Sequence, residues 1–197
     1  TGDIAVTGTG TSTRTVTIDN ITGDGTLGIS IVAGTATDGI NLAPAAGPSP
    51  TFTVDNSGPT LTISAPTPAV TSAGPVTYTV TYTGATAITL SAADVTLNAT
   101  GSATGDIAVT GTGTSTRTVT INNITGDGTL GIFIAAGTAT DGINLAPAAG
   151  PSGTFTVDNT GPSGFTVNIV QAVINQTNET AISFNIIGGE IGATFDY

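Results

Sequence analysis

The sequence predicts an all-β fold made of β-sandwich domains in tandem, with about seven strands in each domain. Short runs of β-branched residues alternate with threonine at a period of two, and Gly, Asn and Asp separate these runs. No segment shows the 3.6-residue period of an amphipathic helix. Residues 1–59 recur at 104–162 with five substitutions, which gives a repeat of 103 residues. A complete β-sandwich takes about 100 residues, so each repeat is expected to enclose its own core.

The alternation assigns one buried face to each predicted strand of the complete repeat. The opening strand places Leu61 and Ile63 inward. In PVTYTVTYT the inward residues are Val76, Tyr78, Val80 and Tyr82, and threonines occupy the outer face. The later strands place inward Ile107, Val109, Val119, Ile121, Leu130, Ile132, Ile134, Phe155 and Val157. The turn at Gly126, Asp127 and Gly128, like its copy at 23–25, is expected to need positive φ.

The Gly- and Pro-containing junctions VDNSGP and VDNTGP mark the predicted domain edges. They divide the chain into the C-terminal half of one repeat (1–56), a complete repeat (57–159) and the N-terminal half of a second repeat type (160–197). The chain opens in the middle of the repeat pattern at Thr1, so we expect it to be cut from a longer protein.

Composition argues against an enzyme and against two classes of partner. The chain has no cysteine, histidine or lysine, so most side chains that act as nucleophiles or general bases are absent. A formal net charge of -11 repels nucleic acid. No run of about 18 apolar residues predicts a membrane span in this segment. With 38% hydrophobic and only 8% charged residues, the chain is expected to fold.

The order SAADVTL, STRTVTI, GDGTLGIFIAAGTATDGINLAPAAGPS and TFTVDNTGP resembles bacterial immunoglobulin-like (Big-type) repeats of giant surface adhesins. GTATD followed by GIN is similar to the ATDxAGN loop of that family and is one residue shorter. The ending NQTNETAISFNIIGGEIGATFDY resembles repeats of gliding and biofilm-forming bacteria. The resemblance implies immunoglobulin-like β-sandwiches in an extracellular, cell-surface stalk or fibre that spaces an adhesive tip from the cell. The partners would then be neighbouring repeats of the same chain.

Two groups of Asp and Asn residues are candidate calcium ligands. One lies in the loop before the final strand and the other where that strand ends, and both are expected to reach one end of the sandwich. Calcium takes six to eight oxygen ligands, and the resemblance implies calcium at such junctions. The alternative is that these residues only stabilise turns through local hydrogen bonds. The candidates are Asp38, Asn41, Asp55, Asp141, Asn144 and Asp158.

Arg14 and its copy Arg117 are the only cationic side chains. Arg117 shares a strand face with inward residues, so we expect its stem at the rim of the core and its guanidinium paired to a carboxylate such as Asp106 or Asp127.

Other functions compete with the stalk. The principal alternative is a self-assembling filament in which an incomplete domain accepts a strand from another copy of the chain. Ranks of threonine also suggest ice binding, although a twisted sheet is a poor flat plane. A carbohydrate-binding module would use exposed aromatics, whereas Tyr78 and Tyr82 are predicted to be in the core.

Overall fold

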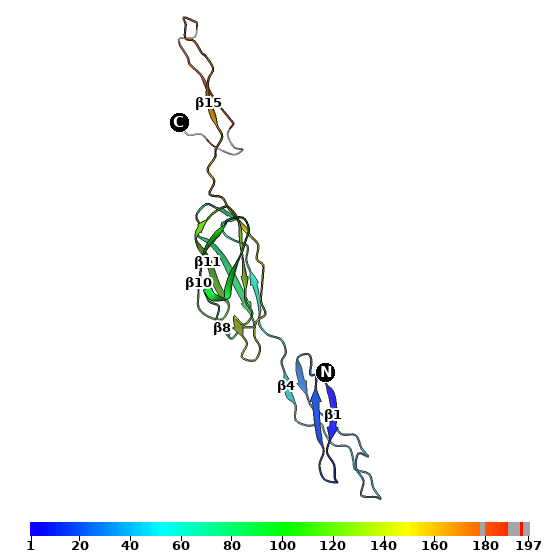
Figure 1. Cartoon of the computed structure of the whole chain (residues 1–197). Helices are drawn as coiled ribbons and strands as arrows, with labels where there is room; N and C mark the ends of the chain where they lie inside the picture. Colours follow the sequence, from blue (N-terminus) through cyan, green and yellow to red (C-terminus); the bar gives the residue numbers. More distant parts are fainter. Residues whose placement is uncertain (178–179, 189–193, 195–197) are drawn as a thin grey trace.

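The computed structural model describes residues 1–177, 180–188 and 194 and is built almost entirely of β-strands. The one helix among these residues is the three-residue 3-10 segment η1 (Ala92–Asp94). Among the described residues, no helix has the length and apolar character that crossing a membrane takes. The predicted all-β fold is confirmed. Figure 1 shows three parts that follow one another along the chain, with the largest in the middle.

The central part carries ten strand segments. They are β5 (Thr60–Ile63), β6 (Val70–Thr71), β7 (Val76–Thr83), β8 (Ala87–Ile88), β9 (Val95–Ala99), β10 (Thr104–Thr110), β11 (Thr116–Thr125), β12 (Gly128–Ile134), β13 (Ala139–Thr140) and β14 (Phe155–Val157). Eight of them form two four-stranded sheets, with the orders β10-β11-β7-β5 and β6-β14-β12-β9. All pairs within these sheets are antiparallel except β14 with β6. The short strands β8 and β13 pair with each other.

The opening segment of the central part contributes to both sheets. β5 pairs with β7 in one sheet, and β6 pairs with β14 in the other. Pro66 and Pro68 lie between them, and proline interrupts a ladder because it has no N–H to donate. With this division the two sheets hold eight strands, one more than the seven expected.

The two sheets enclose a single hydrophobic core. The inward face of β7 is buried, and Tyr78 is 0% exposed. Its hydroxyl donates to the carbonyl oxygens of Leu130 (3.3 Å) and Gly153 (3.0 Å) in or beside the opposite sheet. The predicted inward residues of β11, β12 and β14 are all buried. Those of β5 and β10 are half-buried and pack against the core. The period-two prediction of the core is therefore confirmed.

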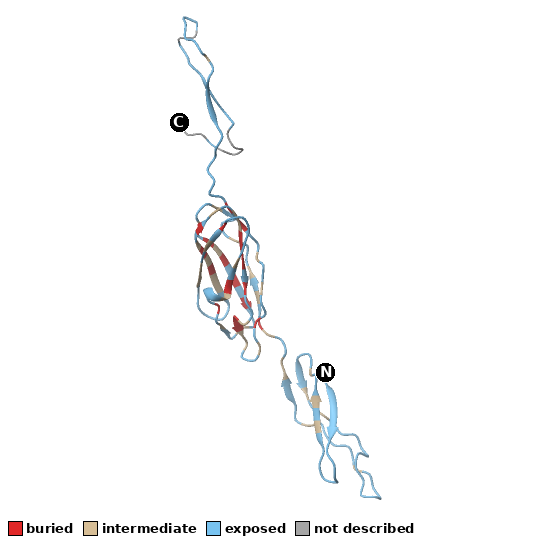
Figure 2. Ribbon diagram, in the orientation of Figure 1, coloured by how far each residue is buried: buried red, intermediate tan, exposed pale blue. Residues whose placement is uncertain are grey.

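The N-terminal part repeats the second half of the central part without its first half. Its strands are β1 (Asp3–Thr7), β2 (Thr15–Asp19), β3 (Gly25–Leu27) and β4 (Phe52–Val54), which pair only as β1-β2 and β3-β4. They match β10, β11, the start of β12, and β14. Nothing in this part stands where β5 to β9 stand in the central part. Every buried residue of the described chain lies between Pro59 and Val157, as Figure 2 shows.

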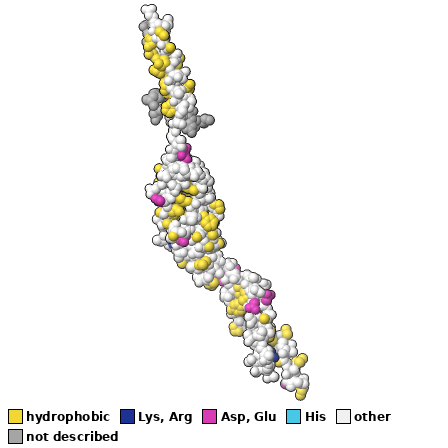
Figure 3. Space-filling view, in the orientation of Figure 1, with side chains coloured by type: hydrophobic (Ala, Val, Ile, Leu, Met, Phe, Trp, Pro, Cys, Tyr) yellow, Lys and Arg dark blue, Asp and Glu magenta, His cyan; other side chains and the backbone are white. Residues whose placement is uncertain are grey.

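The C-terminal part is an antiparallel hairpin of β15 (Thr166–Ile169) and β16 (Phe184–Ile187). All eight residues of these two strands are exposed. Hydrophobic side chains gather on the surface of this part in Figure 3.

Candidate functional site

The polar contacts at the two ends of the central part form the candidate site, because they fix how the chain leaves one repeat and enters the next. At the exit, Asp127 sits in the turn between β11 and β12. Its Oδ1 accepts from the backbone N–H of Asn159 (2.6 Å), and its Oδ2 accepts from the Thr160 hydroxyl (3.0 Å). The Asn159 amide donates to the carbonyl of Gly126 (2.7 Å). These exit contacts hold the first residues after β14 against a turn about 33 positions earlier in the chain.

The same exit contacts recur one repeat earlier. Asp24 accepts from the N–H of Asn56 (2.6 Å) and from the Ser57 hydroxyl. Asn56 donates to the Gly23 carbonyl (2.8 Å). The Ser57 and Asn56 hydrogen bonds lower the pKa of Asp24. Two copies thus build the same arrangement, although one of them lacks a closed core.

At the entry, the loop between β13 and β14 of the central part meets the end of the preceding repeat. The Asn144 amide nitrogen donates to the carbonyl oxygen and to Oδ1 of Asp55, both at 3.2 Å. A Cβ on Gly58 would lie 2.6 Å from the carbonyl oxygen of Leu145, so the close approach requires glycine at that position. These entry contacts join residues that are 89 positions apart in the chain.

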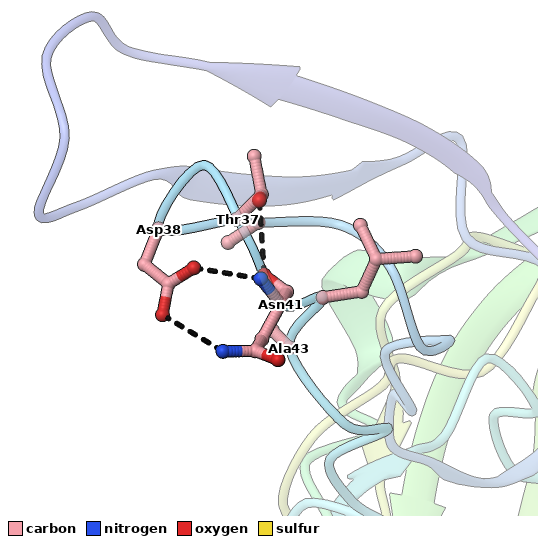
Figure 4. Close-up of a pocket in the computed structure, with 6 residues that line it drawn as sticks. Thr37, Asp38, Asn41 and Ala43 are labelled. Carbon is pink, nitrogen blue, oxygen red and sulfur yellow. Dashed lines mark hydrogen bonds between the residues drawn. The ribbon is translucent and has the colours of Figure 1, made fainter.

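The loop that presents Asn144 is organised by Asp141. Its Oδ1 accepts from the backbone N–H groups of Ile143 and Asn144, both at 2.7 Å. The copy of this loop in the N-terminal part has the same geometry, with Asp38 Oδ1 accepting from Ile40 (2.9 Å) and Asn41 (2.7 Å). Figure 4 shows Asp38 bonded to Asn41. These two residues help to line a hollow of about 280 Å³. In both copies the aspartate therefore stabilises a turn through local hydrogen bonds, as the alternative to calcium binding predicts.

The six predicted calcium ligands lie in three places. Asp55, Asp141 and Asn144 come together at the entry, whereas Asp38 and Asn41 lie in the loop of the N-terminal part and Asp158 lies at the exit. The loop residues and the strand-end residues were expected to meet within one repeat. They meet instead across the junction, where Asn144 of the central part contacts Asp55 of the preceding repeat. Among the described residues no three or more Asp, Glu, His or Cys side chains are close enough to hold a metal ion.

The entry contacts as they stand do not fit a calcium cage. Asn144 bonds the carboxylates of only two residues, Asp55 and Asp141, and its amide presents its nitrogen, not its oxygen, to Asp55. Calcium at these residues stays a prediction of the sequence. A calcium titration followed by melting temperature tests it, because a ligand that binds only the folded state raises stability.

Arg117 lies where the sequence predicts, but its predicted carboxylate partner is wrong. The guanidinium donates to the carbonyl oxygens of Gly113 (3.0 Å), Thr116 (2.8 Å) and Ile88 (3.1 Å). Asp106 instead accepts from the amide of Asn123 (2.8 Å), which has a φ of 49° where the β10–β11 register shifts. Asp127 is engaged in the exit contacts. Arg117 therefore ties the β10–β11 loop to β8 through main-chain carbonyls.

Sequence reasoning recognised the Asp127 turn but missed its part in the exit contacts. A signal was present, since Gly-Asp-Gly and Val-Asp-Asn-(Ser/Thr)-Gly-Pro occur together in both copies at the same separation. An acidic residue in a turn that needs glycine on both sides is well placed to accept hydrogen bonds from a neighbouring segment.

Acidification should destabilise the central part. Backbone hydrogen bonds from Asn144 and Ile143 lower the pKa of Asp141, and hydrogen bonds from the hydroxyl and N–H of Ser91 lower the pKa of Asp94. A lowered pKa in the folded state adds stability that is present above the ordinary carboxyl value of about 3.9 and is lost as pH falls through the folded-state pKa. The melting temperature should stay level from pH 7 to about 5 and fall below about 4.

The control for this pH dependence is Asp94→Asn, which should flatten part of the fall at acid pH. Asp94 and Asp141 are half-buried and neither is fully buried, so each effect is expected to be small. A melting temperature that rises on acidification to about pH 3 would contradict the assignment.

A scan against protein-family models finds no match to this chain, and searches of curated proteins and of solved structures find no significant match.

Proposed function

We propose that the chain is a non-enzymatic structural segment of an extracellular stalk or fibre at a cell surface, built from immunoglobulin-like β-sandwich repeats in line. The observation that carries this proposal is the pair of contact sets at the two ends of the central part. The exit contacts are made by residues that follow the last strand, and the entry contacts by residues that precede the first strand. The entry contacts bond the central part to the end of the preceding repeat, and the exit contacts hold the chain where it leaves the central part.

Three further features support a spacer. The chain enters and leaves the central part at opposite ends, as a linear array requires (Figure 1). The central core is closed and self-sufficient, so copies add length without sharing a core. The outer face of β7 carries Thr79, Thr81 and Thr83, all exposed, and a polar exterior with a net charge of -11 keeps neighbouring copies soluble.

The proposal predicts a rigid junction between the N-terminal and central parts. NMR relaxation of the whole chain should give backbone order parameters near 0.85 for residues 55–59, as in a rigid backbone. Asn144→Ala removes both hydrogen bonds to Asp55 and should lower these values toward about 0.6, while the melting temperature of the central part stays unchanged. Ile143→Ala, at a neighbouring exposed side chain, is the matched control.

Order parameters below about 0.6 at residues 55–59 of the unaltered chain would overturn the proposal, because a freely jointed array does not hold a tip at a fixed distance. Equal values in the unaltered chain and in Asn144→Ala would show that the entry contacts are not what stiffens the junction.

A further inference from the structure

The N-terminal part presents an uncovered apolar face. Its main residues are Val16 and Ile18 on β2, Ile29 after β3, and Phe52 on β4, which we call the acceptor face. They line an open groove of about 440 Å³, and Phe52 is 45% exposed. One edge of β2 pairs with β1, and its other edge pairs with no strand in the part of the chain that the structure describes.

In the central part, the surface that corresponds to the acceptor face is covered by other strands. The matching residues one repeat later are Val119, Ile121, Ile132 and Phe155, all at most 1% exposed. β7 pairs along β11 there, with Tyr78 opposite Val119. The Tyr78 ring lies 6.4 Å from the Phe155 ring, centroid to centroid. The four acceptor residues are identical in the two copies, so the acceptor face is shaped for a strand with apolar side chains at alternate positions.

The C-terminal hairpin has that pattern. Val167 pairs with Ile186, and Ile169 with Phe184, so these four side chains share one face. The same antiparallel arrangement joins β5 to β7, where Leu61 pairs with Tyr82 and Ile63 with Val80.

One more apolar residue extends the match. Ile182 precedes Phe184 by two positions, as Tyr78 precedes Val80. We call Val167, Ile169, Ile182, Phe184 and Ile186 the donor face, and they are 47–61% exposed.

We propose that the donor face of one chain covers the acceptor face of a second copy, with β16 adding to the free edge of β2. The register of β7 on β11 places Ile182 opposite Val16 and Phe184 opposite Arg14. The sheet order becomes β1-β2-β16-β15, the counterpart of β10-β11-β7-β5 in the central part. Strand addition of this kind combines main-chain hydrogen bonds with pockets for alternate side chains.

The occupant that we propose is a second copy, because within residues 1–197 the two faces of one copy lie in different parts of the chain. Figure 1 shows the β15-β16 hairpin and the N-terminal strands beyond opposite ends of the central part. A β7 strand taken from the central part of another copy is a less favourable occupant of the acceptor face. The central part that gives up β7 would lose its own buried core. The β15-β16 hairpin covers no core among the described residues, so its docking adds buried apolar surface at no such loss.

The interface is heterologous, because different surfaces of the two copies meet. Such interfaces generate rings or open filaments. With one donor face and one acceptor face in the described part of each copy, head-to-tail growth follows. This inference goes beyond the spacer function and does not depend on it, since a rigid spacer need not assemble.

Light scattering of the whole chain at several concentrations tests the proposal. The mean mass should rise with concentration beyond twice the 19.0 kDa of one chain. Val16→Asp puts a charge in the acceptor groove, and Phe184→Asp puts one on the donor face. Each variant alone should remain a monomer, because each lacks one of the two faces that a chain of copies needs.

Mixing the two variants gives the sharpest result. Phe184→Asp keeps its acceptor face and Val16→Asp keeps its donor face, so an equimolar mixture should form dimers of twice the chain mass and nothing larger. Ile40→Asp, at a 91% exposed side chain outside both faces, is the matched control and should assemble like the unaltered chain. Both altered faces lie outside the central core, so its melting temperature should not change in any variant.

Three outcomes would overturn the proposal: an unaltered chain that stays monomeric at every concentration, growth that persists in either single variant, or a mixture that stays monomeric. A monomeric chain with a rigid junction would leave the spacer function standing and remove only the head-to-tail assembly.

Discussion

Tyr78→Ala should lower the stability of the central part by about 3–5 kcal/mol, the range for truncating a buried aromatic side chain to alanine. The ring is 0% exposed and lies against Phe155 of the opposite sheet. Its loss leaves a cavity between the sheets and removes the donor to the carbonyls of Leu130 and Gly153. At about 4–8 °C per kcal/mol for a domain of this size, the melting temperature should fall by more than about 12 °C.

Two variants separate the contributions at this position. Tyr78→Phe keeps the ring and loses the hydroxyl, so it should cost about 1 kcal/mol, the net value of a typical hydrogen bond. Thr79→Ala changes the neighbouring exposed side chain and should stay within about 0.5 kcal/mol of the unaltered chain. A melting temperature for Tyr78→Ala close to that of Thr79→Ala would show that the ring does not join the two sheets.

The alternation of β7 made this residue predictable, and it also marks the limit of sequence reasoning. A period of two states which side chains share a face, and Val76, Tyr78, Val80 and Tyr82 are all buried accordingly. It does not state which strands become neighbours. That β7 lies between β11 and β5 depends on pairings such as Val119 with Tyr78, which no local pattern encodes.

Burial itself depends on partner strands, as the two copies show. Phe52 and Phe155 occupy the same place in nearly identical sequences, yet Phe52 is 45% exposed and Phe155 is 1% exposed. The N-terminal part has no counterpart of β5 to β9, and one of these strands, β7, places the Tyr78 ring beside Phe155. A residue pattern can therefore predict which face of a strand is apolar. It does not predict which other strands, of the same fold or of another chain, bury that face.

The candidate site was predictable in residue type and not in arrangement. Asp55, Asp141 and Asn144 were singled out for their oxygens and do meet at the entry. Within one repeat, the loop with Asn144 lies at the entry and the strand end with Asp158 lies at the exit. The sequence does not show this, because it depends on the direction of each strand in the sheets. Arg117 illustrates the same limit. Every residue has a main-chain carbonyl, so the sequence does not indicate which carbonyls accept hydrogen bonds from its guanidinium.

Gly126→Ala should be the second most damaging of these substitutions, at roughly 3 kcal/mol or more, because strain and a clash act together at this turn. The residue has a φ of 79°, and a Cβ there would lie 2.1 Å from the carbonyl oxygen of Ser102. No alanine fits without a shift of the backbone. The Gly126 carbonyl also accepts from the Asn159 amide, so the shift should disturb the exit contacts.

Gly113→Ala is the matched control, since it isolates the cost of positive φ. Its φ is 82°, in the same domain, and nothing lies within 4 Å of a Cβ at that position. It should cost about 1 kcal/mol from backbone strain alone. Gly23→Ala repeats the Gly126 change in the N-terminal copy, where φ is 80° and the space is again open, and should leave the melting of the central part unchanged. Equal losses for Gly126→Ala and Gly113→Ala in thermal unfolding would mean that the turn does not press against Ser102. The exit contacts would then rest on their hydrogen bonds alone, without close packing of the turn against Ser102.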